Sequence, residues 1–279
     1  MIIPVGVSRW RKEQIWNLNS VPHAKVAGVT GGGKTVFLEY LIYEIAANHS
    51  PSEVMFYIID LKGGASFSHF ETLPHVLGVF ASSEETEKAL EICHAEMNDR
   101  LQKIRTSRRE FKDIPKFPDL IIIIDEGGEL AVDMAIDKED RDQRKRIYKH
   151  LASIARIGRE PRVHVIYGTQ QPNAETLPTS IRGQLEATFC FRVENDIDAE
   201  IVLRHKGTAE LLPHIPGRCI YKNPVIGEQT MQAFYVPKDM LERFIKSYRA
   251  DYPSKNKLEY PDGESPSPST IEFTEEVED

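Results

Sequence analysis

Short apolar runs recur along the chain, and three of them end directly before a polar residue. The runs cover residues 54–59, 120–124, 163–168 and 188–193. Asp60, Asp125 and Thr169 follow the first three. Strands that are apolar on both faces are typical of parallel sheets with helices on each side. The pattern therefore predicts an α/β fold with a mostly parallel central sheet flanked by helices.

Apolar residues at helical spacing predict two long amphipathic helices. Ser82 and Glu85 have the spacing of a capping box, and Leu90, Met97 and Leu101 follow at helical spacing. The basic residues of the opposite face are Arg100, Lys103, Arg105, Arg108, Arg109 and Lys112. A second charged helix is expected over residues 140–157, with Arg141, Arg144, Lys145, Arg146 and Lys149. Solvated surface or subunit contact explains such faces better than a DNA track does.

A glycine-rich segment between a predicted strand and a predicted helix matches G-x-x-x-x-G-K-[ST], the phosphate-binding loop of nucleotide hydrolases. It consists of Gly28, Val29, Thr30, Gly31, Gly32, Gly33, Lys34 and Thr35. Residues 24–27 favour a short strand and residues 36–47 a largely buried helix, the context that this motif requires. Main-chain N–H groups of the loop and the helix amino terminus would face the phosphates of ATP.

Two carboxylates at the end of the run 120–124 predict hydrolysis in addition to binding. We expect Lys34 to bridge the β- and γ-phosphates and Thr35 to coordinate Mg²⁺, with Asp125 holding the hydration shell of the metal. Glu126 would orient and polarise the attacking water. An apolar strand that ends in Asp-Glu is a weak signal alone, but the phosphate loop upstream makes it strong.

The polar residues after the run 163–168 are a third candidate part of the site. The carboxyl ends of parallel strands converge in open sheets, which would bring Thr169 and Gln170 to the phosphates. Gln170 could then detect the γ-phosphate or position water. From spacing alone, an ordinary polar loop is an equally good interpretation.

Composition sets limits on location and partners. The run 120–124 is the longest aliphatic stretch and is far too short to span a bilayer, and no signal-peptide pattern begins the chain. Three scattered cysteines indicate a reducing compartment and no metal cluster, so we expect a cytoplasmic protein without a membrane segment.

Acidic residues gather at the end of the chain. From Tyr252 onward, eight acidic residues oppose two lysines among prolines and serines. We expect residues 251–279 to form an acidic disordered tail. Without the residues from Tyr252 onward the net charge of −8 falls to about −2, so charge does not exclude DNA, and a ring could concentrate basic residues in its pore.

Several further motifs occur in a fixed order around these elements. They are residues 21–24 (VPHA), 59–64 (IDLKGG), 73–75 (LPH), 124–126 (IDE), 154–159 (IARIGR), 163–164 (VH) and 169–172 (TQQP). Together with the phosphate loop they resemble the motor domain of the FtsK/SpoIIIE family, within the FtsK–HerA superfamily. The resemblance covers roughly residues 1–240, and we place the motor domain at residues 1–250.

This resemblance implies a RecA-like ATPase that works as a ring, usually a hexamer, with nucleotides at subunit boundaries and a polymer in the central pore. It also implies that one extra strand separates the phosphate-loop strand from the strand that ends at Asp125. An arginine from the neighbouring subunit would stabilise the transferring phosphoryl group. Arg159 is the first candidate, Arg156 and Arg182 are alternatives, and an interface salt bridge explains Arg159 about equally well.

Two positions differ from the family or remain open. Gln171 stands where family members often have arginine, which leaves the role of that arginine unassigned here. Lys62 could contact phosphates from a pore-facing loop, although a structural turn over residues 62–67 is the better interpretation.

The leading hypothesis is an ATP-driven DNA translocase that binds DNA through its phosphates, independently of sequence. The chain contains no predicted membrane segment or winged-helix module, so a plasmid, phage or conjugative element is the expected setting. The alternative is a protein-secretion motor, because type VII secretion ATPases resemble the same domain, especially over residues 155–159. A degenerate nucleotide-binding scaffold is disfavoured by the intact Lys34, Thr35, Asp125 and Glu126.

Overall fold

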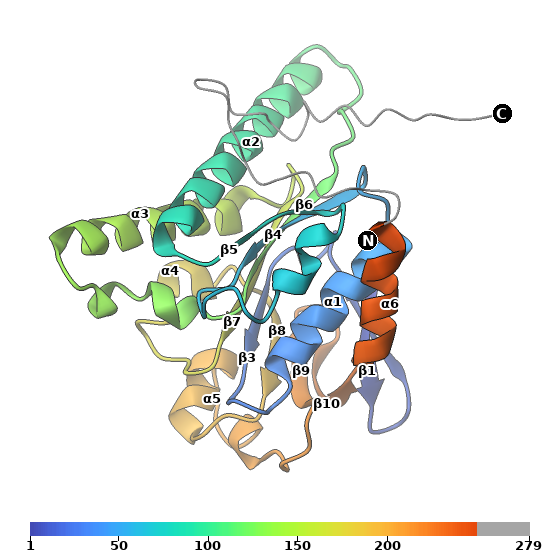
Figure 1. The fold of residues 1–279 in the computed structure, drawn as a ribbon, viewed down its shortest axis with the longest axis vertical. Coiled ribbons are helices and arrows are strands. Elements are labelled where there is room, and N and C mark those ends of the chain that lie inside the picture. Colours follow the sequence, from blue (N-terminus) through green and yellow to red (C-terminus); the bar gives the residue numbers. More distant parts are fainter. Residues whose placement is uncertain (250–279) are drawn as a thin grey trace.

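One ten-stranded sheet forms the centre of the molecule, in the order β2-β1-β10-β9-β8-β3-β7-β6-β4-β5 (Figure 1). The computed structural model describes residues 1–249. The predicted acidic tail, residues 251–279, lies outside the described residues.

Six neighbouring strands are parallel and form the α/β half of the sheet. They are β3 (Ala24–Ala27), β4 (Val54–Ile59), β5 (Val76–Phe80), β6 (Asp119–Ile124), β7 (Val163–Thr169) and β8 (Ala187–Phe191). The remaining four pair antiparallel and extend the sheet beyond β8. They are β1 (Ile2–Ser8), β2 (Glu13–Asn17), β9 (Arg218–Asn223) and β10 (Gly227–Ala233). The prediction of a mostly parallel sheet is confirmed for the half that contains the phosphate loop.

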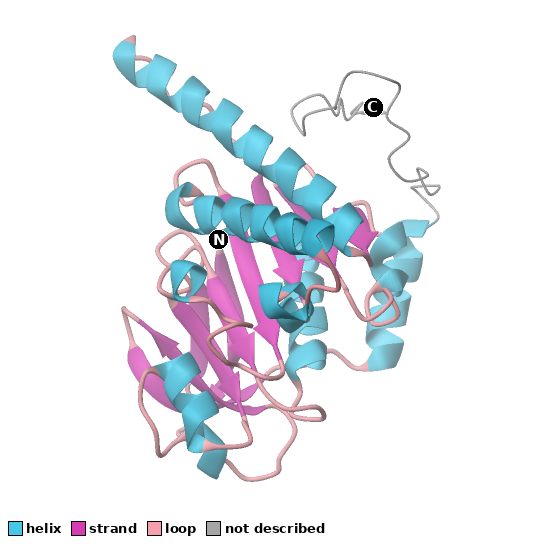
Figure 2. Cartoon of the chain, turned by 90° about the vertical axis from the view of Figure 1, so that its left-hand side faces the viewer, coloured by secondary structure: helices cyan, strands magenta, loops and turns pink. Residues whose placement is uncertain are grey.

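Helices cover both faces of this sheet (Figure 2). On one face lie α1 (Lys34–Asn48) and α6 (Lys238–Arg249), and on the other α2 (Ser83–Arg109), α3 (Lys138–Ile157), α4 (Thr179–Arg182) and α5 (Asp196–Leu203). Short 3₁₀ helices are η1 (Ser68–Thr72), η2 (Gly127–Leu130), η3 (Val132–Met134) and η4 (Ala209–Leu211).

The isoleucine-rich strand β6 shows why both faces need helices. Ile121 and Ile123 pack into the core beneath α1, whereas Ile122 and Ile124 pack into the core beneath α2 and α3. Successive side chains of a strand point to opposite faces, so an unbroken apolar run is stable only when both faces are covered. This burial fixes β6 in the middle of the parallel half.

Helix α2 begins as predicted but differs on its charged face. The Ser82 hydroxyl accepts a hydrogen bond from the Glu85 main-chain N–H at 3.2 Å, which caps the helix. Arg100 was expected on the solvated face, and this prediction is wrong. Its side chain is only 1% exposed, pairs with Glu96 at 2.7 Å, and also donates to the Pro118 carbonyl. The reason is that the connection from α2 to β6 folds back over this part of the helix.

The strand order places the candidate site. β7 lies between β3, which precedes the phosphate loop, and β6, which precedes Asp125. The predicted extra strand is therefore confirmed, and it is β7. Ala27 is in register with Thr169, and Ile124 with Tyr167, so the three strands end at the same edge of the sheet.

Candidate nucleotide-binding and hydrolysis site

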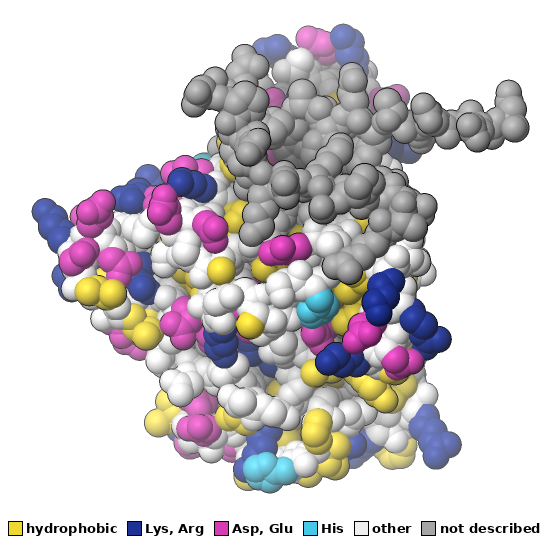
Figure 3. Space-filling model, viewed as in Figure 1, with side chains coloured by type: hydrophobic (Ala, Val, Ile, Leu, Met, Phe, Trp, Pro, Cys, Tyr) yellow, Lys and Arg dark blue, Asp and Glu magenta, His cyan; other side chains and the backbone are white. Residues whose placement is uncertain are grey.

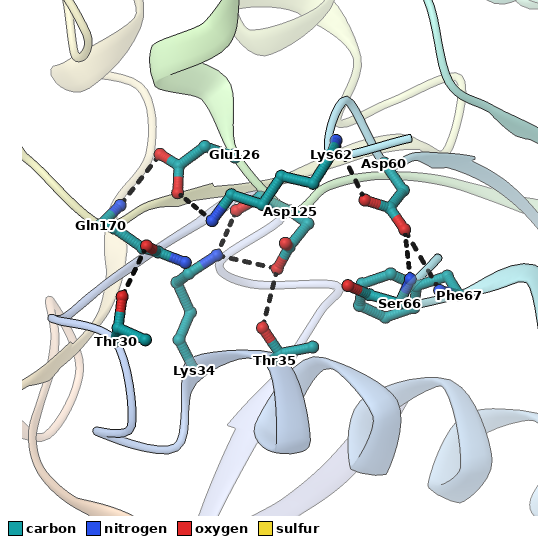
Figure 4. Close-up of polar contacts among 10 residues, drawn as sticks. All are labelled: Thr30, Lys34, Thr35, Asp60, Lys62, Ser66, Phe67, Asp125, Glu126 and Gln170. Atoms are coloured by element: carbon teal, nitrogen blue, oxygen red, sulfur yellow. Dashed lines mark hydrogen bonds and ion pairs between the residues drawn. The ribbon is translucent and has the colours of Figure 1, made fainter. Parts of the chain in front are cut away.

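The carboxyl edge of the parallel strands brings together residues from four separate segments (Figure 4). Lys34 comes from the start of α1, Asp125 and Glu126 follow β6, Gln170 follows β7, and Lys62 follows β4. Because ligands of open parallel sheets bind outside the carboxyl ends of the strands, this edge is where a nucleotide site is expected. The predicted site residues Lys34, Thr35, Asp125, Glu126 and Gln170 do meet here.

The phosphate loop is shaped by a close main-chain contact. Gly33 has φ +108°, a conformation that side chains disfavour, and a Cβ at this position would come within 2.8 Å of the Gly217 nitrogen. The Gly217 N–H in turn donates to the Gly32 carbonyl at 2.9 Å. The loop before β9 therefore supports the phosphate loop from one side, and only glycine fits at position 33.

The helix after the loop has an uncapped amino terminus. No side chain caps α1 at Gly33, and its first turn contains no acidic residue. The first N–H groups of a helix have no intrahelical partner and attract anions, so this end of α1 is suited to phosphate.

Lys34 and Thr35 both contact Asp125. The Lys34 ammonium is buried and lies 2.8 Å from Asp125 Oδ1, and it also donates to the main-chain carbonyl of Asp125. The Thr35 hydroxyl donates to the same Oδ1 at 3.2 Å. These contacts join the start of α1 to the end of β6, across the tip of β7.

Glu126 is held at both of its carboxylate oxygens. The Gln170 main-chain N–H donates to Oε1 at 3.0 Å, and the Lys62 ammonium lies 3.3 Å from Oε2. The Glu126 side chain is only 7% exposed. A buried carboxylate needs partners of this kind, since an unpaired buried charge costs several kcal/mol.

Gln170 connects Glu126 to the phosphate loop. Its side-chain carbonyl accepts a hydrogen bond from the Thr30 hydroxyl at 2.9 Å, while its main chain contacts Glu126. The neighbouring Thr169 hydroxyl is buried and has no hydrogen-bond partner among residues 1–249. The segment after β7 thus contacts both Glu126 and the phosphate loop. That Gln170 detects the γ-phosphate or positions water stays a prediction.

Two residues of this site were not recognised in the sequence. Lys62 was interpreted as part of a turn, and Asp60 only as the residue that ends a strand. Asp60 accepts hydrogen bonds from the main-chain N–H groups of Ser66 and Phe67, at 2.8 and 3.2 Å, and so shapes the loop that contains Lys62. The sequence position of Asp60 could have indicated its place in the site, because Asp60 follows an apolar strand in the same way as Asp125 does.

Two side-chain oxygen atoms, one at the start of α1 and one directly after β6, are suited to binding a magnesium ion. Mg²⁺ prefers oxygen ligands and is usually bound through one or two protein oxygens together with phosphate and water. The Thr35 hydroxyl and the Asp125 carboxylate are adjacent and provide two such oxygens beside the phosphate loop.

Arg159 lies at the other edge of the sheet. It is exposed on the connection from α3 to β7 and borders a hollow together with Asp119, Arg162 and His164, at the amino ends of β6 and β7. Arg159 is therefore not brought to the phosphate loop of its own chain. Arg156 is exposed in the last turn of α3, Arg182 ends α4, and Gln171 is exposed beside Gln170.

The FtsK/SpoIIIE family model matches residues 1–114, which include the phosphate loop and Lys62. The DNA translocase FtsK of Leptospira interrogans (serovar copenhageni) is 29% identical over 249 residues, covering 84% of this chain and 25% of the relative. The type VII secretion system protein EssC of Staphylococcus aureus is 30% identical over 236 residues, covering 78% of this chain and 15% of that protein. The chain thus spans about a quarter of the length of FtsK relatives.

Solved structures support the same assignment. The pCW3 conjugation coupling protein TcpA, determined with ATPγS, superposes with a TM-score of 0.77 at 26% identity, over 88% of this chain and 70% of that chain. The cytoplasmic domain of the Thermomonospora curvata type VII secretion ATPase EccC has the same fold, with a TM-score of 0.73 at 22% identity. The predicted P-loop fold and the resemblance are confirmed: residues 1–114 match the FtsK/SpoIIIE family, and the fold is that of the ATPγS-bound coupling protein TcpA.

Proposed function

We propose that this protein is an ATP-driven DNA translocase that acts as a ring, with Mg-dependent ATP hydrolysis at the carboxyl edge of the sheet. The observation that supports hydrolysis most directly is Glu126, a buried carboxylate held at both oxygens next to Lys34 and Asp125. Similarity to FtsK and to the coupling protein TcpA supports DNA as the polymer.

Each residue has a defined task in the proposed reaction. The phosphate loop and the start of α1 bind the β- and γ-phosphates, and Lys34 neutralises part of their charge. Thr35 and Asp125 would hold Mg²⁺, which supplies further neutralisation of charge on the phosphates. Glu126 accepts a proton from water as the water oxygen bonds to the γ-phosphorus. The bond from that phosphorus to the bridging oxygen breaks, which yields ADP and phosphate.

Glu126 and the phosphate loop are coupled through Gln170. The main chain of Gln170 contacts Glu126, and its side chain contacts Thr30 in the loop. A change in the phosphate loop on departure of the γ-phosphate would therefore be transmitted to Glu126 through Gln170. We propose that Gln170 serves as this connection.

The mixed distribution of charge on a single subunit favours a DNA contact that forms only when subunits assemble. Basic and acidic side chains are interspersed on the face shown in Figure 3. Many basic residues of α2 and α3 are paired, including Lys103 with Asp99 at 2.7 Å and Arg144 with Asp140 at 2.8 Å. We therefore assign DNA contact to the pore of a ring, in which phosphates are bound without sequence preference.

The ring would place Arg159 of one subunit at the nucleotide of the next. Arg159 is exposed at the opposite edge of the sheet from its own phosphate loop, which leaves it available to a neighbouring subunit. In this proposal the assembly is a hexamer in the cytoplasm. No helix within residues 1–249 is long and apolar enough to cross a membrane.

ATP turnover with and without DNA tests the proposal. The chain, at an assembly mass measured in the same buffer, should hydrolyse ATP faster when single- or double-stranded DNA is added. The stimulation should weaken as salt rises, because phosphate contacts release counterions. A competent oligomer whose turnover neither form of DNA changes would contradict DNA as the polymer.

A protein-secretion motor is the second candidate, and a specific observation favours it. EssC is slightly more identical to this chain than FtsK is, at 30% over 78% of the chain. Turnover that is stimulated by secretion-signal peptides and unaffected by DNA would support this function in place of translocation.

A further inference from the structure

Lys62 is the charged partner of Glu126, and no role is assigned to it by the family similarity reported above. Its ammonium lies 3.3 Å from Glu126 Oε2, with the Lys62 side chain 36% exposed. Figure 4 shows the side chain extending from the end of β4 across the carboxyl edge toward Glu126. Lys34, the other lysine of the site, is paired with Asp125, so each of the two adjacent carboxylates has its own lysine.

The loop that contains Lys62 is built to keep it there. The Asp60 carboxylate accepts hydrogen bonds from the N–H groups of Ser66 and Phe67, and the Gly64 N–H donates to the Asp60 carbonyl at 3.0 Å. Gly63 and Gly64 have φ values of +81° and +71°. Two consecutive residues in this conformation need glycine, and they turn the chain sharply directly after Lys62. The Phe67 side chain is fully buried and fixes the far end of the loop.

Removal of the Lys62 side chain would leave the Glu126 carboxylate without its charged partner. Among residues 1–249, Oε2 has no hydrogen-bond partner and relies on the ion pair with Lys62, and Oε1 accepts from the neutral Gln170 N–H. A nearly buried carboxylate in that situation gains by rotating toward solvent. Such a rotation would displace the group that must accept a proton from water.

We propose that Lys62 is a positioning residue for ATP hydrolysis: it holds Glu126 in the orientation that activates water. This inference rests on the proposed role of Glu126 as the catalytic base. It assigns to the loop 60–67 a direct influence on hydrolysis, separate from phosphate binding by Lys34.

The test compares Lys62→Met, Lys62→Arg and a matched control, Lys88→Met, in the full chain. Lys88 is an exposed lysine of α2 that pairs with Glu84 at 2.8 Å, far from the phosphate loop in the chain. For Lys62→Met we expect kcat to fall at least about tenfold and at most by the 10²–10⁴ that a general base contributes, while the Kd of fluorescent ATP stays within about threefold. Lys62→Arg should recover part of the lost kcat, because it retains the charge. Lys88→Met should behave as the unmodified protein.

Double substitution separates this inference from the proposed function. If Lys62 acts through Glu126, adding Lys62→Met to Glu126→Gln should cause no further loss of kcat. The inference would be overturned if Lys62→Met kept full kcat. It would also be overturned if Lys62→Met lowered kcat by the same factor in the unmodified protein and in Glu126→Gln. Retained turnover in Glu126→Gln alone would instead contradict the role of Glu126. A melting temperature of Lys62→Met equal to that of the control excludes a folding defect as the cause.

Discussion

The two edges of the parallel sheet are both rich in buried polar groups, but they are organised differently. At the carboxyl edge, Lys34, Thr35 and Lys62 reach Asp125 and Glu126 from loops and from the start of a helix. At the amino edge, the polar groups stand on the strands themselves or directly before them. The first arrangement surrounds the phosphate loop, and the second joins neighbouring strands to each other.

At the amino edge, Asp119 is the centre of a hydrogen-bonded network. His164 contacts Asp119 Oδ1 at 2.8 Å through Nε2 and the Pro22 carbonyl at 3.1 Å through Nδ1. Arg162 donates to the other oxygen of Asp119. Burial would raise the pKa of Asp119, but the hydrogen bonds from His164 and Arg162 outweigh burial and lower it. The network ties β6 and β7 to the segment before β3.

Residues of a recurring motif can therefore stabilise the fold without taking part in ATP hydrolysis. His23 and His164 belong to segments that helped to identify the family, yet they lie at the edge away from the phosphate loop. Substitutions at the carboxyl edge should therefore alter turnover, and substitutions at the amino edge should alter stability. Arg159, exposed at the amino edge, is the expected exception.

The largest expected effect comes from that exception. Arg159→Ala should lower DNA-stimulated kcat by about 10³–10⁵-fold, the range typical of an arginine supplied in trans. Subunit mixing checks the origin of the loss. Arg159→Ala mixed with Glu126→Gln should be more active than either alone, because some interfaces then combine an intact Glu126 with an intact Arg159. A mixture no more active than its components would place Arg159 outside the neighbouring site.

Glu126→Gln should lower kcat by about 10²–10⁴-fold, since glutamine cannot accept the proton from water. ATP binding should remain within a few-fold, because Lys34 and the phosphate loop are unchanged. Single-turnover hydrolysis and equilibrium binding measure the two quantities. His164→Gln is the matched control from the amino edge: we expect a lower melting temperature and, at temperatures where the variant is folded, unchanged ATP affinity.

Acid should destabilise the protein through His23. Burial, and secondarily the nearby His164, lowers the pKa of His23 to about 3 from an ordinary 6.5. Its Nδ1 accepts a hydrogen bond from the Val165 N–H at 3.0 Å, which requires the neutral ring. Between pH 6.5 and about 3 the unfolded chain binds a proton that the folded chain does not, so stability falls as pH falls. By pH 5 the loss should be about 2 kcal/mol, measured by denaturant unfolding.

His23→Asn should remove most of this dependence, because an amide oxygen can accept the Val165 N–H without titrating. His214→Asn, at an exposed position, is the control and should leave the pH profile unchanged. If both variants keep the profile of the unmodified protein, the acid sensitivity arises elsewhere.

The smallest effect is expected for Thr30→Val. This change removes the exposed hydrogen bond from Thr30 to Gln170 and keeps the side-chain shape. A neutral hydrogen bond contributes about 0.5–1.5 kcal/mol, so kcat/KM should fall by no more than about tenfold. A change in kcat/KM as large as that of Glu126→Gln would mean that Gln170 acts on the reaction through its side chain and not through its main chain.

Sequence reasoning succeeded where one local pattern determines the structure. The apolar run of β6 can be stable only in the interior of a covered sheet, and the glycine-rich loop before α1 has few other uses. It failed where a long-range contact decides. Arg100 has the helical position of a surface residue, but the chain returning to β6 buries it. Lys62 is near Glu126 only because β4 lies next to β6 in the sheet, which neither local sequence reveals.

The central claim is that ATP hydrolysis at the carboxyl edge moves DNA. The most direct measurement is the displacement of streptavidin from biotinylated DNA, single- and double-stranded, by the assembled chain with ATP. The account predicts displacement that requires ATP, is absent with ATPγS, and is lost in Glu126→Gln although that variant still binds ATP. Robust ATP turnover without displacement from either form of DNA would contradict it.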